Sequence, residues 1–294
     1  MSAKDWLDDD RVADALDDAA LMYLAVAGRH GPHVTPLAFD RRDRELWALT
    51  PRDSAKVRAI RRDARVGVLI RHAGRTVIAG GRARLVDPLT GRGLSAVLSP
   101  DLPFTALSYL ARNDRRVIGT VLDGPSPGLA LGRTAVRISL NRVALLDEGR
   151  VRVAWGRWPE ASTLLAGDLT PSEPDLAGVP TALHPLLADN AAAALGWHTA
   201  DGPVALPARW HTGGGITVPR GALELTGALS AGPAALTVQR SKNRISSVRG
   251  VMLLGTGHAR SGDAASTVSI DTTRLTWWSG EDTGTVTRPV SSTA

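Results

Sequence analysis

The sequence predicts a mainly β protein with flanking helices, built from two tandem copies of one fold. Short apolar runs alternate with turns that contain Gly and Pro through most of the chain, a pattern typical of strands joined by hairpins. One spacing also occurs twice, because Leu24-x6-Gly31-Pro32-x3-Pro36 returns 171 residues later as Leu195-x6-Gly202-Pro203-x3-Pro207. No apolar run approaches the roughly 20 residues that a membrane-spanning helix needs. We therefore expect two β domains and no membrane segment.

The elements of the first copy follow in a simple order. A leading helix at Arg11–Ala20 comes first, and it is followed by a strand, a glycine-containing turn and a second strand. A short helix with Ser54 as its N-cap then separates the third strand from a buried fourth strand, and the fifth is bent at its glycines. The expected strands lie within Tyr23–Phe39 (two strands), Leu46–Leu49, Val66–Ile70 and Thr76–Val86.

Further matches extend the repeat and divide the chain. Thr50-Pro51-Arg52 returns as Val218-Pro219-Arg220, Gly81-x-Ala83-Arg84 as Gly257-x-Ala259-Arg260, and Val136-x-Ile138 as Val268-x-Ile270. The number of residues that separates matching positions becomes smaller near the end of the copies. This change predicts a helical insertion at about 88–131 in the first copy.

The division into domains follows from these matches. The first domain is predicted at 1–158 and the second at 181–294, where Thr181–Ala192 repeats the leading helix. Residues 159–180 are rich in Pro, Ser, Gly and acidic residues, which is the composition of a linker.

The start of the short helix predicts an anion site. Thr50 and Arg52 precede it, and Ser54 and Lys56 belong to its first turn. A helix N-terminus with hydroxyls and cations is suited to a phosphate. On spacing alone, an equally good interpretation is that Arg52, Lys56, Arg58, Arg61 and Arg62 form a solvated helix face. Lys56 stands out because the chain otherwise has lysine only at positions 4 and 242.

This order of elements resembles the pyridoxamine 5'-phosphate oxidase-like split-barrel superfamily over roughly residues 10–150. The motifs that carry the resemblance are His33-Val34-Thr35-Pro36 after Gly31, Thr50-Pro-Arg-x-Ser54-x-Lys56-x-Arg58, Arg62-Asp63-x-Arg65-Val66 and Gly81-x-Ala83-x-Leu85. The resemblance implies two tandem split barrels that form a pseudo-dimer, because single-barrel relatives form two-fold dimers with cofactors in the interface. It does not extend to the oxidase's C-terminal substrate motifs.

The resemblance also implies a cofactor and a class of function. The expected cofactor is FMN, with F420 as the alternative and haem as a third option, and the expected function is an oxidoreductase acting on an unidentified small molecule. NAD(P)H or reduced F420 would serve as reductant. Candidate cofactor-binding residues are His33, Val34, Thr35, Thr50, Arg52, Ser54 and Lys56, with Arg209 and Trp210 from the second copy. Trp210 is interpreted first as a core residue, and no catalytic residue is assigned.

The second copy departs from the anion motif. Under an ungapped match Ser54 becomes Ala222 and Lys56 becomes Glu224, and a carboxylate there would repel phosphate. We therefore expect one cofactor per chain at the interface of the two barrels. Because the second barrel already supplies the two-fold partner, the expected state is a monomer with internal pseudo-symmetry or a weak homo-oligomer.

Composition excludes several other classes. The chain has no cysteine and its seven histidines lack zinc-site spacing, which argues against disulfides and structural zinc and fits a cytoplasmic location. The net charge of +6 is scattered among acidic residues, so we expect no nucleic-acid partner. The alternative function is a non-catalytic flavin- or haem-binding protein, a sensor or an interaction partner.

Overall fold

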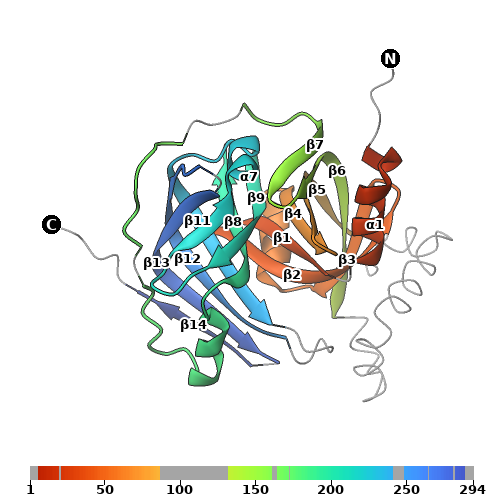
Figure 1. Cartoon of the computed structure of the whole chain (residues 1–294). Helices are drawn as coiled ribbons and strands as arrows, with labels where there is room; N and C mark the ends of the chain where they lie inside the picture. Colours follow the sequence, from red (N-terminus) through yellow and green to blue (C-terminus); the bar gives the residue numbers. More distant parts are fainter. Residues whose placement is uncertain are drawn as a thin grey trace.

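Two seven-stranded antiparallel sheets, which lie side by side in Figure 1, form the molecule. The computed structural model describes residues 6–19, 21–86, 132–160, 164–171, 173–240, 248–263, 265–280 and 282–288. The predicted helical insertion at 88–131 lies outside these residues. None of the described helices is long and apolar enough to cross a membrane.

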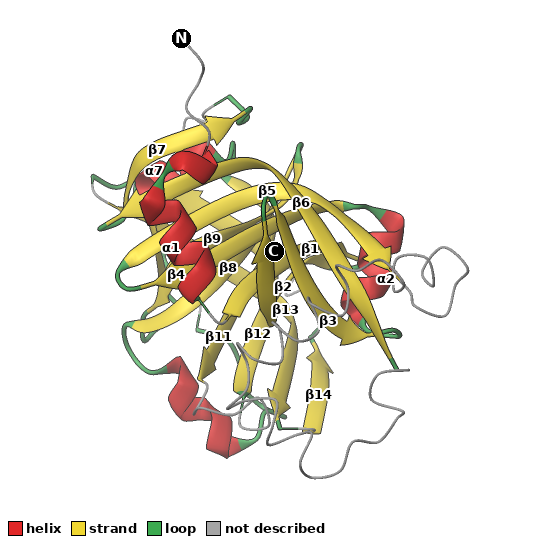
Figure 2. Ribbon diagram, turned by 90° about the vertical axis from the view of Figure 1, so that its right-hand side faces the viewer, coloured by secondary structure: helices red, strands yellow, loops and turns green. Residues whose placement is uncertain are grey.

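The first sheet and its helices occupy the chain up to Gly156. Its elements are η1 (Trp6–Asp8), α1 (Asp10–Asp18), β1 (Leu21–Gly28), β2 (Gly31–Arg42), β3 (Glu45–Pro51), α2 (Ala55–Arg62), β4 (Arg65–His72), β5 (Arg75–Val86), β6 (Arg133–Asp147) and β7 (Arg150–Gly156). α1 and α2 lie on different sides of this sheet (Figure 2).

The second sheet follows a crossing segment that connects the two halves in sequence. Its elements are η2 (Thr181–Leu187), β8 (Ala191–Thr199), β9 (Gly202–Trp210), β10 (Ile216–Pro219), α7 (Arg220–Leu225), β11 (Ala231–Arg240), β12 (Arg249–Arg260), β13 (Ala265–Ser279) and β14 (Asp282–Thr287). Leu164 and Val179 of the crossing segment are buried in the core of the second half.

Each sheet closes into a barrel in the same way. The strand orders are β3-β2-β1-β4-β5-β6-β7 and β10-β9-β8-β11-β12-β13-β14, and the extra pairings are β3–β6 and β10–β13. In the first sheet, β6 pairs with β3 through residues 133–139 and with β7 through residues 142–147. The first half of β6 therefore closes the barrel by pairing with β3. The second half of the same edge pairs with the additional strand β7. This geometry confirms the predicted fold class, a mainly β chain of two tandem split barrels.

The register of the two barrels corrects one sequence match. The β5–β6 ladder shifts between Gly80 and Gly81, and the β12–β13 ladder shifts between Leu254 and Gly255. A Cβ at Gly81 would lie 2.3 Å from the Ser139 carbonyl oxygen, and a Cβ at Gly255 would lie 1.9 Å from that of Asp271. The bulge glycine that corresponds to Gly81 is therefore Gly255. The predicted match to Gly257 was wrong by two residues.

The helices of the second half also differ from the ungapped match. η2 is a 3-10 helix that ends at Leu187, and β8 begins at Ala191 within the stretch predicted as helix. α7 starts directly after β10 and ends at Leu225, with no side-chain cap, whereas α2 starts four residues after β3. Glu224 therefore lies in the last turn of α7, and Lys56 lies in the first turn of α2.

Small residues allow the two barrels to pack closely. A Cβ at Gly67 of β4 would lie 2.6 Å from the Cα of Val204 in β9, and a Cβ at Gly196 of β8 would lie 3.1 Å from the Cβ of Val34 in β2. Apolar side chains from both barrels form one continuous core across this contact. The first barrel has a second core of its own, which α1 covers on one side.

Candidate functional site

The start of α2 is fixed by its own cap. The Oγ of Ser54 accepts a hydrogen bond from the backbone N–H of Val57 at 3.3 Å, which confirms Ser54 as the N-cap. Thr50, at the end of β3, is buried, and its Oγ1 lies 3.4 Å from the Oγ of Ser54. The two predicted hydroxyls therefore lie together at the N-terminus of this helix.

The arginines around this turn have separate tasks. The backbone N–H of Arg52 donates to the carbonyl oxygen of Gly132 at 3.0 Å, and its Nε donates to that of Arg133 at 3.4 Å. Arg52 thus ties the turn to the start of β6. The guanidinium of Arg58 donates to the carbonyl oxygen of Asp53, and Arg61 and Arg62 are exposed. These arginines fit the solvated-face interpretation, and Lys56 does not.

Lys56 points toward β2. Its Nζ donates to the Oγ1 of Thr35 at 3.0 Å, and Thr35 is only 8% exposed. No carboxylate of the described residues pairs with this ammonium. Burial without a counter-ion disfavours the charged form, and it lowers the pKa of Lys56 to about 8.

His33 lies two residues before Thr35 on β2, and so both side chains project from the same face of the strand. Burial, together with the nearby charge of Lys56, lowers the pKa of His33 to about 3. The imidazole is therefore neutral at ordinary pH, with one nitrogen available as a donor and the other as an acceptor.

Val34 projects from the opposite face of β2, into the contact between the barrels. Its side chain is fully buried, and its carbonyl oxygen accepts a hydrogen bond from the Oγ1 of Thr237 in β11. Val34 therefore anchors the strand that carries His33 and Thr35 to the second barrel.

The two residues predicted from the second copy lie elsewhere. Trp210 is 3% exposed in the core of the second barrel, and its Nε1 donates to the carbonyl oxygen of Leu187 at 3.0 Å. The preferred interpretation as a core residue is confirmed, and no face of the ring is left for a cofactor. Arg209 is exposed, and its Nη1 lies 3.2 Å from the Oδ1 of Asn190. Trp210 is thus a core residue of the second barrel, and the cofactor-binding role of Arg209 stays a prediction.

The matching surface of the second barrel is apolar. The β1–β2 pair Leu24 and Thr35 corresponds to the β8–β9 pair Leu195 and Leu206. In the same register, Val204 stands where the first barrel has His33, and both Val204 and Leu206 are buried. Glu224 forms an ion pair with Arg220 at 2.7 Å instead of facing this surface.

Sequence reasoning missed a partly buried cation between the barrels. Arg71, at the end of β4, donates to the carbonyl oxygens of Ala193 and Ala208 in the second barrel. Burial lowers its pKa below the ordinary value. Position 71 follows a buried apolar strand, and nothing in the local pattern distinguishes it from the exposed arginines. Arg71 therefore acts as a tie between the barrels. Among the described residues no group of three or more His, Asp or Glu side chains is arranged to hold a metal.

Comparisons with known proteins give partial similarities. No protein-family model and no curated protein matches the chain. Solved structures do: a FAD-binding protein from Mesorhizobium loti is 22% identical, with a TM-score of 0.32, and the match covers 45% of this chain and 89% of that one. An F420 reductase is 18% identical, with a TM-score of 0.33, 45% of this chain covered and 94% of that one.

A third solved structure carries the predicted family name. It is a protein from Clostridium acetobutylicum related to general stress protein 26 of the pyridoxinephosphate oxidase family, 10% identical, with a TM-score of 0.37. That match covers 50% of this chain and 92% of the other. The predicted family is thus among the matches. The fold itself is established here by the strand order and by the β3–β6 and β10–β13 closures.

Proposed function

We propose that this protein binds one phosphorylated flavin or deazaflavin per chain and uses it as an oxidoreductase on a small-molecule substrate. FMN is the first choice and F420 the alternative. The proposed site consists of the start of α2 and the facing part of β2, with the second barrel as the opposite wall.

The observation that carries this proposal is the environment of Lys56. A partly buried ammonium whose recorded partner is a single hydroxyl, 3.0 Å away, destabilises the cofactor-free protein. A phosphate at this point would supply the missing counter-charge, and the side chains of Thr35 and Thr50 offer hydroxyl donors nearby. The positive end of the α2 dipole acts in the same direction. The residues present therefore fit a phosphate group.

A bound flavin or deazaflavin would supply hydride chemistry. The chain's own residues have three tasks in this proposal. Lys56 neutralises the phosphate, neutral His33 offers a hydrogen bond without adding charge, and Val34 holds β2 against the second barrel. The apolar Val204 and Leu206 at the matching positions support a single site per chain.

The test is a binding titration of the whole protein with FMN and with F420, followed by addition of NAD(P)H or another reductant. We expect saturation at about one equivalent per chain, since only one barrel carries the cation. Lys56→Glu should weaken binding by about 2–4 kcal/mol, because it removes a charge-assisted contact and adds repulsion. Arg61→Glu is the matched control, because Arg61 is an exposed cation on the same helix.

The outcomes separate the candidate functions. Equal affinity for the wild type and Lys56→Glu would remove the cofactor from this site, and two equal sites would contradict the argument from Val204 and Leu206. A cofactor that binds and resists every reductant would favour the alternative, a carrier or sensor.

A further inference from the structure

A charged cavity lies next to Arg65, just after the C-terminal end of α2. It has a volume of about 750 Å³, within the range of small-molecule sites. Four arginines line it, Arg65, Arg82, Arg142 and Arg157, against the two carboxylates of Glu160 and Asp201. The lining is therefore positive, and it combines β4, β5 and β6 with the segment after β7 and the β8–β9 turn.

Arg142 lies deepest. Its side chain is 11% exposed, and its guanidinium carbon is 5.3 Å from the centre of the Trp158 ring. A Cβ at Gly80 would lie 2.3 Å from the Nε of Arg142, so the absence of a side chain at Gly80 creates the space for this arginine. That Nε is buried and has no hydrogen-bond partner. The remaining recorded contact is long, 3.5 Å from Nη1 to the Oδ2 of Asp201.

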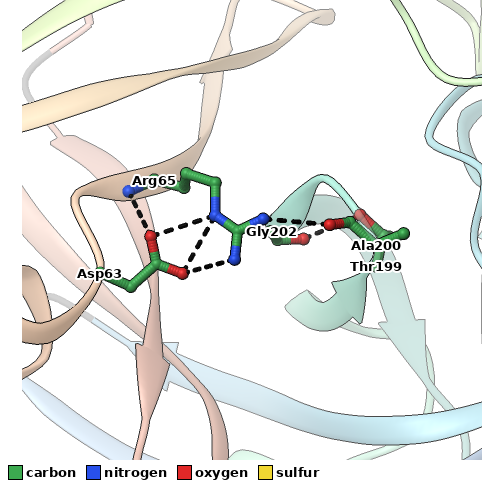
Figure 3. Close-up of polar contacts among 5 residues, drawn as sticks. All are labelled: Asp63, Arg65, Thr199, Ala200 and Gly202. Carbon is green, nitrogen blue, oxygen red and sulfur yellow. Dashed lines mark hydrogen bonds and ion pairs between the residues drawn. The ribbon is translucent and has the colours of Figure 1, made fainter.

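Arg65 is held in place across the two barrels. Its guanidinium contacts the carboxylate of Asp63 at 2.8 Å, and its Nη1 donates to the carbonyl oxygen of Ala200 at 3.0 Å (Figure 3). The Oγ1 of Thr199 closes the same turn by donating to the carbonyl oxygen of Gly202 at 2.8 Å. The turn that carries Asp201 is thereby fixed beside the first barrel.

Arg82 and Arg157 have no such partners. Both are exposed, and neither pairs with a carboxylate in the part of the chain that the structure describes. Arg82 is the direct cross-strand partner of Arg65, an arrangement of like charges that destabilises a sheet. The indole of Trp158 is oriented by its own hydrogen bond, from Nε1 to the carbonyl oxygen of Trp155 at 3.0 Å.

We propose that this cavity is a second ligand site, which binds a small phosphorylated molecule bearing at least two negative charges. Arg142 and Arg65 form the fixed floor, and Arg82 and Arg157 close on the anion from the rim. Guanidinium groups suit phosphate because they donate two parallel hydrogen bonds. The four arginines also outnumber the three nearby carboxylates, those of Asp63, Glu160 and Asp201. Trp158 offers an aromatic edge for the remainder of the ligand. The proposal is independent of the cofactor site, which lies at the N-terminal end of α2.

The experiment is calorimetric titration of the whole protein with pyrophosphate and with ADP. It is carried out in a Lys56→Met background, so that the first site does not contribute. We expect saturable binding of both probes, and the double variant Arg82→Gln with Arg157→Gln should bind at least tenfold more weakly. The control is Arg84→Gln with Arg150→Gln, two exposed arginines outside the cavity lining with the same loss of charge.

Three results would overturn the proposal. They are no binding of either probe at millimolar concentration, an equal loss in the control pair, and undiminished binding in the double variant. Arg142→Lys gives an independent test, since it keeps the positive charge and loses the planar guanidinium that donates two parallel hydrogen bonds. We expect it also to bind at least tenfold more weakly while its melting temperature in the absence of ligand stays close to that of the parent. Full affinity in this variant would contradict the role given to Arg142.

Discussion

Lys56 and His33 show at the residue scale how the residues of the proposed site oppose stability. Both titratable groups are partly buried and interact with each other, and burial lowers the pKa of each. A structural role would favour apolar residues here, as in the second barrel, where Val204 and Leu206 occupy the matching strand. Perturbed pKa values in a site with convergent donors are consistent with the proposed cofactor site.

Lys56→Met should stabilise the cofactor-free protein and weaken cofactor binding. The pKa of Lys56 falls from 10.5 to about 8 on folding, so the unfolded chain binds more protons between these values and wild-type stability rises with pH across that window. Below pH 8 the variant should therefore be more stable by about 1–3 kcal/mol, and its advantage should shrink toward pH 10.5. Urea unfolding at several pH values measures this. A variant less stable than the wild type at pH 7 would contradict it.

His33 should make the protein sensitive to acid. Its pKa falls from 6.5 to about 3 on folding, so the unfolded chain takes up a proton between these values while the folded chain stays neutral there. Stability should therefore decline as pH falls below 6.5, by up to a few kcal/mol. His33→Gln should flatten this part of the pH profile in thermal unfolding. An unchanged profile would show that His33 is not buried as neutral imidazole.

The bulge glycines show at the element scale what a single position does for a barrel. Gly81 and Gly255 occupy the same point in the two ladders, and in both cases a side chain would meet a backbone carbonyl of the neighbouring strand. The sequence indicated strands bent at glycines, but it matched Gly81 with the wrong glycine of the second copy. Gly255 and Gly257 both fit a match to Gly81 by sequence alone. The position of the bulge, which is visible only in the strand pairing, identifies Gly255 as the equivalent of Gly81.

Gly81→Ala should destabilise the protein by about 1–3 kcal/mol, the usual range for overpacking. Its Cβ would lie 2.3 Å from the Ser139 carbonyl oxygen, so β5 or β6 must move. Gly215→Ala is the control, because its nearest neighbour would be 3.6 Å away, an ordinary contact. Denaturant unfolding of both variants tests this, and equal losses would show that the bulge tolerates a side chain.

Sequence and structure agree unevenly at the scale of the whole molecule. The hairpins, the cap at Ser54 and the tandem order follow from local turn and capping signals, and so they could be predicted. The position at which α7 starts could not be predicted, because Pro219 supplies no side-chain cap that would mark it. The arginine cavity could not be predicted either, because it joins residues from five separate segments through packing between the two halves.

The contact between the barrels makes each half depend on the other. Residues of the first barrel, including Val34, Leu69 and Ile78, are buried in the core that they share with the second barrel. Arg71 reaches across to two carbonyl oxygens of that barrel. An isolated first half would expose an apolar face, and such a face promotes association.

Residues 1–158 alone should therefore self-associate and bind the cofactor more weakly than the whole chain. The second barrel that would be lost supplies the Thr237 hydroxyl to Val34, and it is the far wall of the proposed site. Sedimentation of the fragment, with and without FMN, measures both effects. Leu69→Lys in the fragment should reduce association, because it places a charge on the exposed face, and in the whole chain it should be severely destabilising, because Leu69 is fully buried. A monomeric fragment with full affinity would mean that the second barrel is an independent module.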